Sequence, residues 1–266
     1  MKIQGTQDSH IQIPKLLLKE FSTPVLIKNK SGRNEKPKMV YKLDMNGNIT
    51  QVNIKDENTE KGYYEDFIEE KLLPLIEVKF GDLKTKIIQS LKMNQEVINF
   101  NKNDILTVKK FCSLCLIRSQ AVVSDIKSKS YFIDIYENSP QNVVVYQYFK
   151  SPDLVDKYIV GENITYVKNE TSLNYVLPRF YVIGIKQKNG VFDYFIPITP
   201  KILIRLTTEK TVDNNILYTG RMTEKDVDNF NKLAILYEYK HNNKAVYAKN
   251  KEDLVRYIDF IKDFNI

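Results

Sequence analysis

The first half of the chain is dominated by apolar residues at helical spacing. From Tyr64 to Met93, apolar side chains recur every three or four residues, which predicts a long helical region. Pro74 and Gly81 are expected to kink or divide this region. A second helix is predicted from Asp104 to Gln120, with its cap at the first residue or at Asn103. Because this helix is apolar on nearly all sides, we expect it to be buried among other elements.

Strand patterns lie on both sides of these helices. Residues 39–43 and 49–54 flank Asn46-Gly47, a pair that favours a tight hairpin because it accepts positive φ angles. Asn189-Gly190 predicts a second hairpin in the same way. After about residue 128 the chain becomes rich in β-branched and aromatic residues with turn signals between them, which predicts strands. The strands expected there span residues 143–149, 158–160, 180–185 and 195–206.

Shorter elements are predicted at the two ends of the chain. Residues 1–22 are expected to form an extended segment and then a short helix that begins near Pro14. A helix is predicted from Thr223, with Asp226 as its acidic capping partner. A short strand at residues 245–248 and an amphipathic helix at residues 252–264 close the chain.

The order of these elements favours an α+β fold. Hairpin, helices, strands, helix, short strand and helix do not alternate regularly, as a parallel α/β fold would require. We therefore predict an N-terminal hairpin and long helices, a central antiparallel or mixed sheet, and C-terminal helices. No break in composition requires two domains, so residues 1–266 are expected to form a single domain, with a weak seam allowed near residues 125–140.

Composition and charge limit the class of protein. Hydrophobic residues make up 42% of the chain and charged residues 27%, so a sizeable core is expected. No run of about 18 uncharged apolar residues is present, and the first eight residues lack the apolar segment of a secretory signal. We therefore expect a cytoplasmic protein with no membrane partner.

The net charge of +7 permits an acidic partner such as nucleic acid. The segment from Lys28 to Lys38 is predicted to be an exposed basic loop, in which Lys28, Lys30 and Arg33 are candidate binding residues for nucleic acid or a partner protein. The chain is rich in Lys, Asn and Ile, so lysine is its default surface cation. Net charge alone is therefore weak evidence for a nucleic-acid partner.

Arginine is scarce and therefore informative. The six arginines are Arg33, Arg118, Arg179, Arg205, Arg221 and Arg256. Where lysine is the default cation, an arginine is more often required for its planar, bidentate guanidinium. Arg118 stands near the end of the apolar helix, where it must reach solvent or meet an acceptor, because an unpaired buried charge is very costly. It either forms a structural ion pair or holds a phosphate or carboxylate of a ligand.

Several acidic and polar residues are further candidates. Glu70 and Glu77 are seven residues apart, so they can share a helix face if the helix continues past Pro74. They form either a solvated acidic face or a pair that binds a divalent metal or receives a buried arginine. Glu162 and Asn163 lie at a strand-to-strand junction, where sites are often built, although a plain turn is equally compatible.

Histidine and cysteine are rare in this chain. His10, before the first helix, is a candidate general base or ligand, unless it only makes a local hydrogen bond. His241 lies in a polar turn and is expected at the surface. Cys112 and Cys115 have the spacing of half a zinc or redox site, but no second cysteine pair exists, so packed free thiols are favoured and no metal ligands are assigned. Gly-rich phosphate loops and common hydrolase motifs are absent.

A set of short motifs resembles a bacterial family of unknown function, the family numbered 4238. The residues that carry the resemblance are Ser9 to Phe21, Tyr63 to Glu77, Leu116 to Ser119, Val160 to Ile164 and Ile196 to Pro200. The resemblance spans about residues 9–250. Three positions depart from the family pattern: the His-to-Pro spacing is one residue longer, Glu162 replaces Asp and Ile164 replaces Pro. The resemblance implies an accessory bacterial protein without an assigned activity, in some cases associated with phage defence or mobile elements.

Two hypotheses follow for the function. In the first, the protein is a binding or sensor protein that contacts nucleic acid or a partner protein through its basic surface, while the polar residues form a buried network that fixes the fold. In the second, it is a metal-dependent nuclease, in which His10, Glu162, Asn163 and Arg118 form one polar pocket with Glu70 or Glu77. The second hypothesis requires Arg118 and Glu162 to line an open cleft together.

Overall fold

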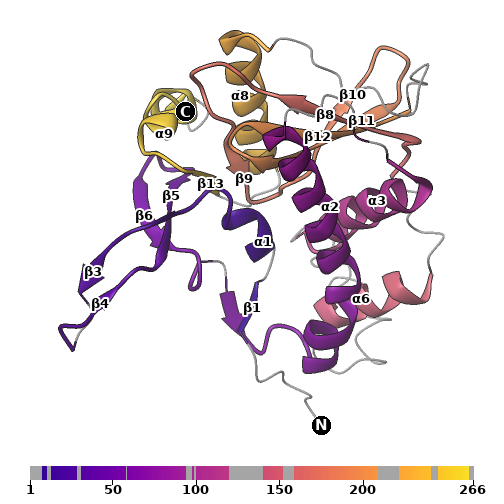
Figure 1. Cartoon of the computed structure of the whole chain (residues 1–266), viewed down its shortest axis with the longest axis horizontal. Helices are drawn as coiled ribbons and strands as arrows, with labels where there is room; N and C mark the ends of the chain where they lie inside the picture. Colours follow the sequence, from indigo (N-terminus) through magenta and orange to yellow (C-terminus); the bar gives the residue numbers. More distant parts are fainter. Residues whose placement is uncertain are drawn as a thin grey trace.

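The computed structural model describes most of the chain. The described residues are 8–10, 13–28, 31–57, 59–93, 98, 100–119, 140–151, 159–208, 222–240 and 245–263. Helices and antiparallel sheets make up this part, which confirms the predicted α+β class (Figure 1). Among the helices described, none combines the length and the apolar character that crossing a membrane requires. The seam allowed near residues 125–140 lies almost entirely outside the described residues.

Five strands form one antiparallel sheet. Its order is β2 (Thr23–Pro24), β5 (Lys38–Asp44), β13 (Ala245–Ala248) and β9 (Leu177–Pro178), and β6 (Ile49–Asn53) also pairs with β5. β5 and β6 form the predicted hairpin, in which Gly47 has a φ of +83° that glycine adopts without strain. The Asp44 carboxylate accepts hydrogen bonds from the backbone N–H groups of Asn46 and Asn48 and thereby fixes the turn.

Four strands form a second antiparallel sheet. Its order is β10 (Ile183–Lys186), β11 (Phe192–Thr199), β12 (Ile202–Thr207) and β8 (Asn163–Lys168). The predicted Asn189-Gly190 turn joins β10 to β11, and Gly190 has a φ of +84°. β12 pairs with β8 along its whole length, from Ile202 opposite Lys168 to Thr207 opposite Asn163. Asn163 is therefore held at the beginning of a regular, buried strand.

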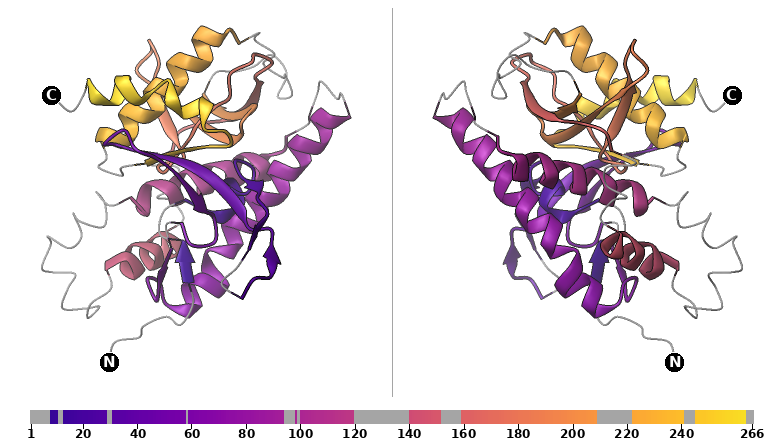
Figure 2. Two further views of the ribbon diagram at one scale, coloured as in Figure 1. Left: turned by 90° about the vertical axis from the view of Figure 1, so that its left-hand side faces the viewer. Right: turned by 90° about the vertical axis from the view of Figure 1, so that its right-hand side faces the viewer.

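The sheets separate two hydrophobic cores. Along β13, Ala245 and Tyr247 belong to one core, whereas Val246 and Ala248 belong to the other, because successive side chains of a strand point to opposite faces. One core contains residues of α2 (Pro74–Lys92) and α3 (Lys102–Ile117). The other contains residues of α8 (Glu224–Lys240), α9 (Glu252–Val255) and α10 (Ile258–Lys262). Helices therefore cover both sides of the sheets (Figure 2).

The helices at the N-terminal side enclose the first core. β1 (Asp8–His10), before the β5–β6 hairpin in the chain, pairs with β7 (Thr59–Lys61), after it. The short helix α1 (Lys15–Leu18) buries two of its leucines. A π-helical turn, η1 (Ile68–Leu72), leads into α2. α2 packs against α3 through the stacked rings of Phe80 and Phe111, whose centroids are 3.6 Å apart. α6 (Pro140–Lys150) lies against α3 and η1.

Several predictions about individual elements were wrong. Residues 159–160 are not in a strand, and the one strand expected at residues 195–206 is two strands, β11 and β12. Residues 143–149 lie in the helix α6, because their packing against the helical core overrides the strand preference of their β-branched residues. The closing helix is two short helices, α9 and α10. Gly81 does not divide α2, which is continuous from Pro74 onwards. The cap of α3 is Asn101, whose side chain accepts from the Asp104 N–H while Asp104 accepts from the Asn101 N–H.

The segment predicted to be a basic loop is a small hairpin. β3 (Ile27–Lys28) pairs with β4 (Asn34–Glu35), and Gly32 between them has a φ of +77°. This hairpin projects from the body of the molecule on the side opposite α3 and α6 (Figure 1). We call residues 27–38 the basic arm.

Candidate functional site

Arg118 lies in the interior of the protein. It follows the last residue of α3 and is 2% exposed. Its Nη1 atom donates a hydrogen bond to Oε1 of Glu77, in the first turn of α2, at 2.9 Å. The guanidinium also lies over the ring of Tyr64, with 5.4 Å from Cζ to the ring centroid, which is within the range of a cation–π contact. Of the two roles left open for Arg118, the structure therefore contains the ion pair.

Three further polar residues surround this pair. Glu69 from η1 and Tyr181 from the loop after β9 both raise the pKa of Arg118 electrostatically. Ser9 from β1 lies beside Glu69. We call Ser9, Tyr64, Glu69, Glu77, Arg118 and Tyr181 the Arg118 cluster. Its members come from β1, the turn before η1, η1, α2, the end of α3 and the loop after β9, so the cluster ties these segments together.

Burial dominates the electrostatics of the Arg118 cluster. It raises the pKa of Glu77, and Arg118 only partly opposes this effect. Burial likewise raises the pKa of Glu69, against the opposing influence of the Ser9 hydroxyl and Arg118. For Arg118 burial lowers the pKa, but Tyr64, Glu77 and Tyr181 outweigh it, so the net pKa is raised and the guanidinium stays charged. The cluster is one permanent cation between two carboxyl groups that bind protons more readily than usual.

Some atoms of the Arg118 cluster have no hydrogen-bond partner among the described residues. Ser9 Oγ, Glu69 Oε1 and Tyr181 OH are buried without a hydrogen bond of ordinary geometry. Glu77, by contrast, receives the direct bond from Arg118. The two carboxylates therefore differ in role: Glu77 is the structural partner of the arginine, and Glu69 is a nearby acid that the arginine influences without a direct bond.

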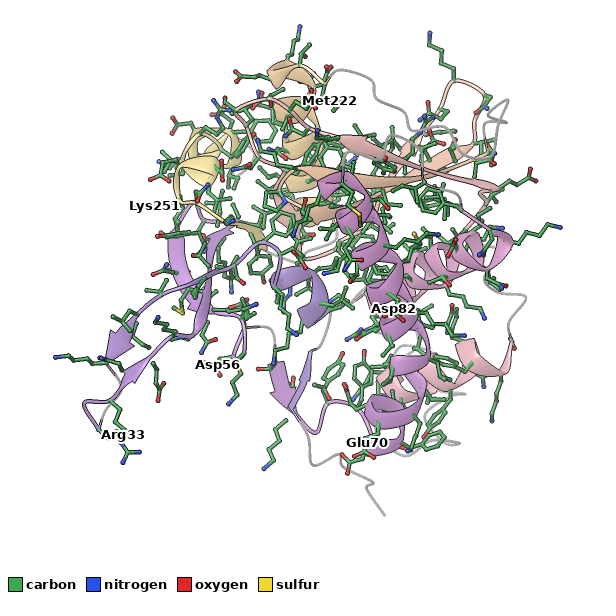
Figure 3. The ribbon with its side chains drawn as sticks, in the orientation of Figure 1. Arg33, Asp56, Glu70, Asp82, Met222 and Lys251 are labelled. Atoms are coloured by element: carbon green, nitrogen blue, oxygen red, sulfur yellow. The ribbon has the colours of Figure 1, made fainter. Side chains whose placement is uncertain are left out.

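The π-helical turn explains why Glu69 and not Glu70 faces Arg118. A spacing of seven residues in a regular helix would have placed Glu70 with Glu77, as expected from the sequence. In η1 the N–H of Leu73 bonds to the carbonyl of Ile68, an i→i+5 bond that takes one extra residue into the turn. The residue eight positions before Glu77 therefore shares its face. Glu70 is exposed, at the lower end of the molecule in Figure 3.

Among the described residues, no hydrogen bond or ion pair joins Glu162 to Arg118. Glu162 is exposed, and its backbone N–H donates to the carbonyl of Thr207 at 2.9 Å. Asn163 is buried at the start of β8. Because Arg118 is buried and Glu162 is exposed, the two do not line an open cleft together. The backbone of His10 pairs with Thr59, and its side chain lies outside the described part of the structure.

The described residues contain no cluster of side chains that could hold a metal ion. There, no three His, Cys, Asp or Glu side chains are grouped as ligands of one ion. Cys112 and Cys115 are buried free cysteines, as predicted, and burial raises the pKa of both thiols well above its usual value. Their thiols are therefore kept protonated and serve as packing groups in the core.

Glu238 is a second interior carboxylate that the sequence analysis did not select. Its side chain is fully buried on α8, and Oε1 accepts a hydrogen bond from the N–H of Phe180. Burial raises its pKa to about 8, although the Phe180 N–H and Arg179 oppose the rise. A signal was present in the sequence, because Glu238 continues the buried stripe of α8 that contains Val227 and Ala234.

The basic arm presents its charges to solvent. Lys28, Arg33, Lys36 and Lys38 are all exposed, and Glu35 is the one acidic residue in the sequence of residues 27–38. Arg33 lies at the far end of the arm (Figure 3). Lys30, also predicted as a binding residue, lies outside the described residues. The arm and the Arg118 cluster are thus an exposed and a buried group of charges on the same protein.

These features define an α+β protein with an interior ion pair and an exposed basic hairpin. A model of the family described as protein of unknown function, DUF4238, matches residues 10–158. The match covers more than half of the 266 residues, so the chain belongs to this family. The matched part includes the basic arm, Glu69, Glu77 and Arg118, whereas Glu162 and Asn163 lie beyond it. Neither the curated proteins nor the solved structures contain a match to the chain.

Proposed function

We propose that this protein binds nucleic acid through its basic arm and that the Arg118 cluster supports the fold. The observation that carries the proposal is the exposure of Lys28, Arg33, Lys36 and Lys38 on a two-stranded ribbon that projects from the body. The family resemblance supports an intracellular accessory role in bacteria, in phage defence or with mobile elements. The net charge of +7 agrees with an anionic partner.

The shape and charge of the arm suit a nucleic-acid backbone. A two-stranded β-ribbon fits the major groove of duplex DNA, and lysine and arginine neutralise phosphates along both strands. Each phosphate contact releases counterions and adds about −0.9 to the slope of log affinity against log salt. Four arm cations in contact with phosphates would therefore give a slope of about −3 to −4.

The Arg118 cluster is a poor candidate for holding a phosphate. Arg118 is 2% exposed and its guanidinium already contacts Glu77 and Tyr64. A phosphate would have to displace the carboxylate and enter the core, where an unmatched charge is very costly. This comparison favours the arm as the binding element.

Fluorescence anisotropy with labelled duplex DNA, single-stranded DNA and RNA tests the proposal. We expect the wild-type protein to bind at least one of the three, with a Kd that rises steeply with salt. The triple variant Lys28→Ala/Arg33→Ala/Lys36→Ala should bind at least ten-fold more weakly. The matched control is Lys186→Ala/Lys188→Ala/Lys249→Ala, which removes three exposed lysines elsewhere and should bind nearly as well as the wild type. Equal weakening in both triple variants would contradict a role for the arm.

The same mixtures test the nuclease alternative. With Mg²⁺ or Mn²⁺ present, the binding proposal predicts that all three nucleic acids remain intact. Cleavage that is lost in Glu162→Gln would instead support a metal-dependent nuclease built on the predicted pocket. Cleavage that is unchanged by Glu162→Gln would exclude that pocket and require a different site.

A further inference from the structure

A groove lies between α2, α3 and α6, on the other side of the molecule from the basic arm. Its volume is about 530 Å³, within the range of binding pockets. Its lining includes Leu75 and Lys79 from α2, Leu106, Thr107 and Lys110 from α3, and Phe149 from α6. The three helices lie on the side of the molecule opposite the arm in Figure 1.

Large apolar side chains are exposed to solvent in the groove. Leu75 is 55% exposed and Leu106 is 40% exposed, although both are large aliphatic side chains. Two further exposed apolar residues lie outside the groove, Val78 on α2 and Phe67 next to η1, which are 58% and 54% exposed. Phe67 stacks on Tyr146 of α6, so it belongs to the same helical face. Several exposed apolar side chains on one set of packed helices favour an interaction site.

The charged residues of the groove all have one sign. Lys79 and Lys110 line it, and no acidic residue does in the part of the chain that the structure describes. Neither ammonium group has an ion-pair partner among the described residues. An occupant that offers only apolar groups would leave these cations without partners, whereas carboxylates beside an apolar stripe would match both features.

We propose that this groove binds an acidic amphipathic helix of a partner protein. Such a helix would place apolar residues at i, i+3, i+4 and i+7 against Leu75, Leu106 and Phe149, with Glu or Asp beside Lys79 and Lys110. A groove between helices suits this occupant, because packed helices meet through ridges and grooves of side chains at 8–10 Å between axes. Val78 and Phe67 do not line the groove itself, and a helix of several turns offers more apolar surface to such neighbouring residues than a small ligand does.

The test uses three synthetic peptides of 18 residues. The acidic peptide has Leu at i, i+3, i+4 and i+7 spacing with Glu and Ala elsewhere; the shuffled peptide has the same composition without this spacing; and the basic peptide has Lys in place of Glu. By fluorescence anisotropy, the wild-type protein should bind the acidic peptide at least ten-fold more tightly than either of the others. No binding of the acidic peptide, or equal binding of the shuffled peptide, would overturn the proposal.

Two pairs of variants locate the site. Lys79→Glu/Lys110→Glu should reverse the preference from the acidic to the basic peptide, whereas the control Lys186→Glu/Lys188→Glu, with the same change in net charge, should keep it. Leu106→Asp should weaken binding of the acidic peptide at least ten-fold, whereas Val160→Asp, at an apolar residue of similar exposure, should not. Similar effects in each variant and its control would show that the peptide binds elsewhere.

Competition separates a helix from a small amphipathic anion. Dodecanoate should displace the acidic peptide only weakly, because it reaches fewer of the apolar residues. Displacement at micromolar dodecanoate, together with poor discrimination between the acidic and shuffled peptides, would assign the groove to a fatty-acid-like ligand and overturn the helix proposal. Variants of the basic arm should not change peptide binding, so this proposal stands or fails separately from nucleic-acid binding.

Discussion

Two arginines of this protein occupy opposite environments. Arg118 is buried at the end of α3, bonded to Glu77 and stacked on Tyr64. Arg33 stands exposed at the end of the basic arm. The buried guanidinium has its partners within the fold, so its charge contributes to tertiary structure. The exposed one adds to a local excess of positive charge that an external anion can neutralise.

The comparison shows that the burial of an arginine determines whether it contributes to stability or is accessible to a binding partner. Removing one partner of a buried ion pair typically costs about 3–5 kcal/mol, because the other charge stays in the core. Removing an exposed cation usually changes stability by less than about 0.5 kcal/mol. The two regions should therefore separate in experiment: the Arg118 cluster through stability and the basic arm through binding.

The largest expected effect is that of Arg118→Ala. Removing the buried guanidinium leaves the half-buried carboxylates of Glu77 and Glu69 without their cation and opens a cavity, and we expect a loss of about 3 kcal/mol in the free energy of unfolding. Urea denaturation followed by circular dichroism measures this quantity. Arg33→Ala is the matched control and should stay within about 0.5 kcal/mol of wild type. Equal stabilities for the two variants would refute a structural role for Arg118.

The next largest effect is a pH dependence caused by Glu238. The folded protein raises the pKa of this carboxyl to about 8 from its ordinary value of 4.5, so between these values the folded state binds the proton more strongly than the unfolded chain. Its contribution to stability is therefore complete below pH 4.5, falls as the pH rises and is lost above pH 8. The slope is at most about 1.4 kcal/mol per pH unit.

Glu238→Gln should remove this slope. The amide cannot ionise, so the free energy of unfolding of the variant should fall less between pH 5 and pH 8 than that of the wild type. Chemical denaturation at four pH values measures the difference, and Glu252→Gln, at an exposed position on α9, serves as the control. A wild-type slope that persists in Glu238→Gln would show that another group causes it.

A smaller effect distinguishes the three glutamates of η1 and α2. Glu77→Gln should cost about 1–3 kcal/mol, less than full removal of a partner, because the amide oxygen still accepts the hydrogen bond from Arg118 but no longer carries the charge. Glu69→Gln should cost less, since Glu69 has no direct bond to the guanidinium, and Glu70→Gln at the surface should be nearly neutral. Thermal unfolding of the three variants gives the order. A larger loss for Glu70 than for Glu69 would contradict the π-helical register.

Much of the local structure could be predicted because local chemistry determines it. Asn46-Gly47 and Asn189-Gly190 turn the chain wherever they lie between strands, and Thr223 with Asp226 caps α8 through hydrogen bonds within four residues. The ion pair of Arg118 with Glu77 was one of the predicted alternatives. It followed from the cost of burying an unpaired charge, which does not depend on the details of the fold.

The remainder depends on tertiary packing. The helical state of residues 143–149 arises from contacts with the helical core and runs against their own strand preference. The π-helical turn at Ile68–Leu72 moves the register by one residue, and no pattern in the sequence indicates an i→i+5 bond. The Arg118 cluster also needs Ser9 and Tyr181, which lie more than 170 residues apart in the chain.

The central claim is that the basic arm binds nucleic acid and the interior arginine stabilises the fold. The most direct test is to compare the salt dependence of duplex DNA binding in Arg33→Ala and in Arg118→Lys. The lysine variant keeps the interior charge, so the protein should stay folded with reduced stability. Arg33→Ala should reduce the slope of log affinity against log salt by about one, because one phosphate contact is lost, whereas Arg118→Lys should leave the slope unchanged. A slope that changes in Arg118→Lys and stays unchanged in Arg33→Ala would contradict the assignment of binding to the arm and of stability to the interior arginine.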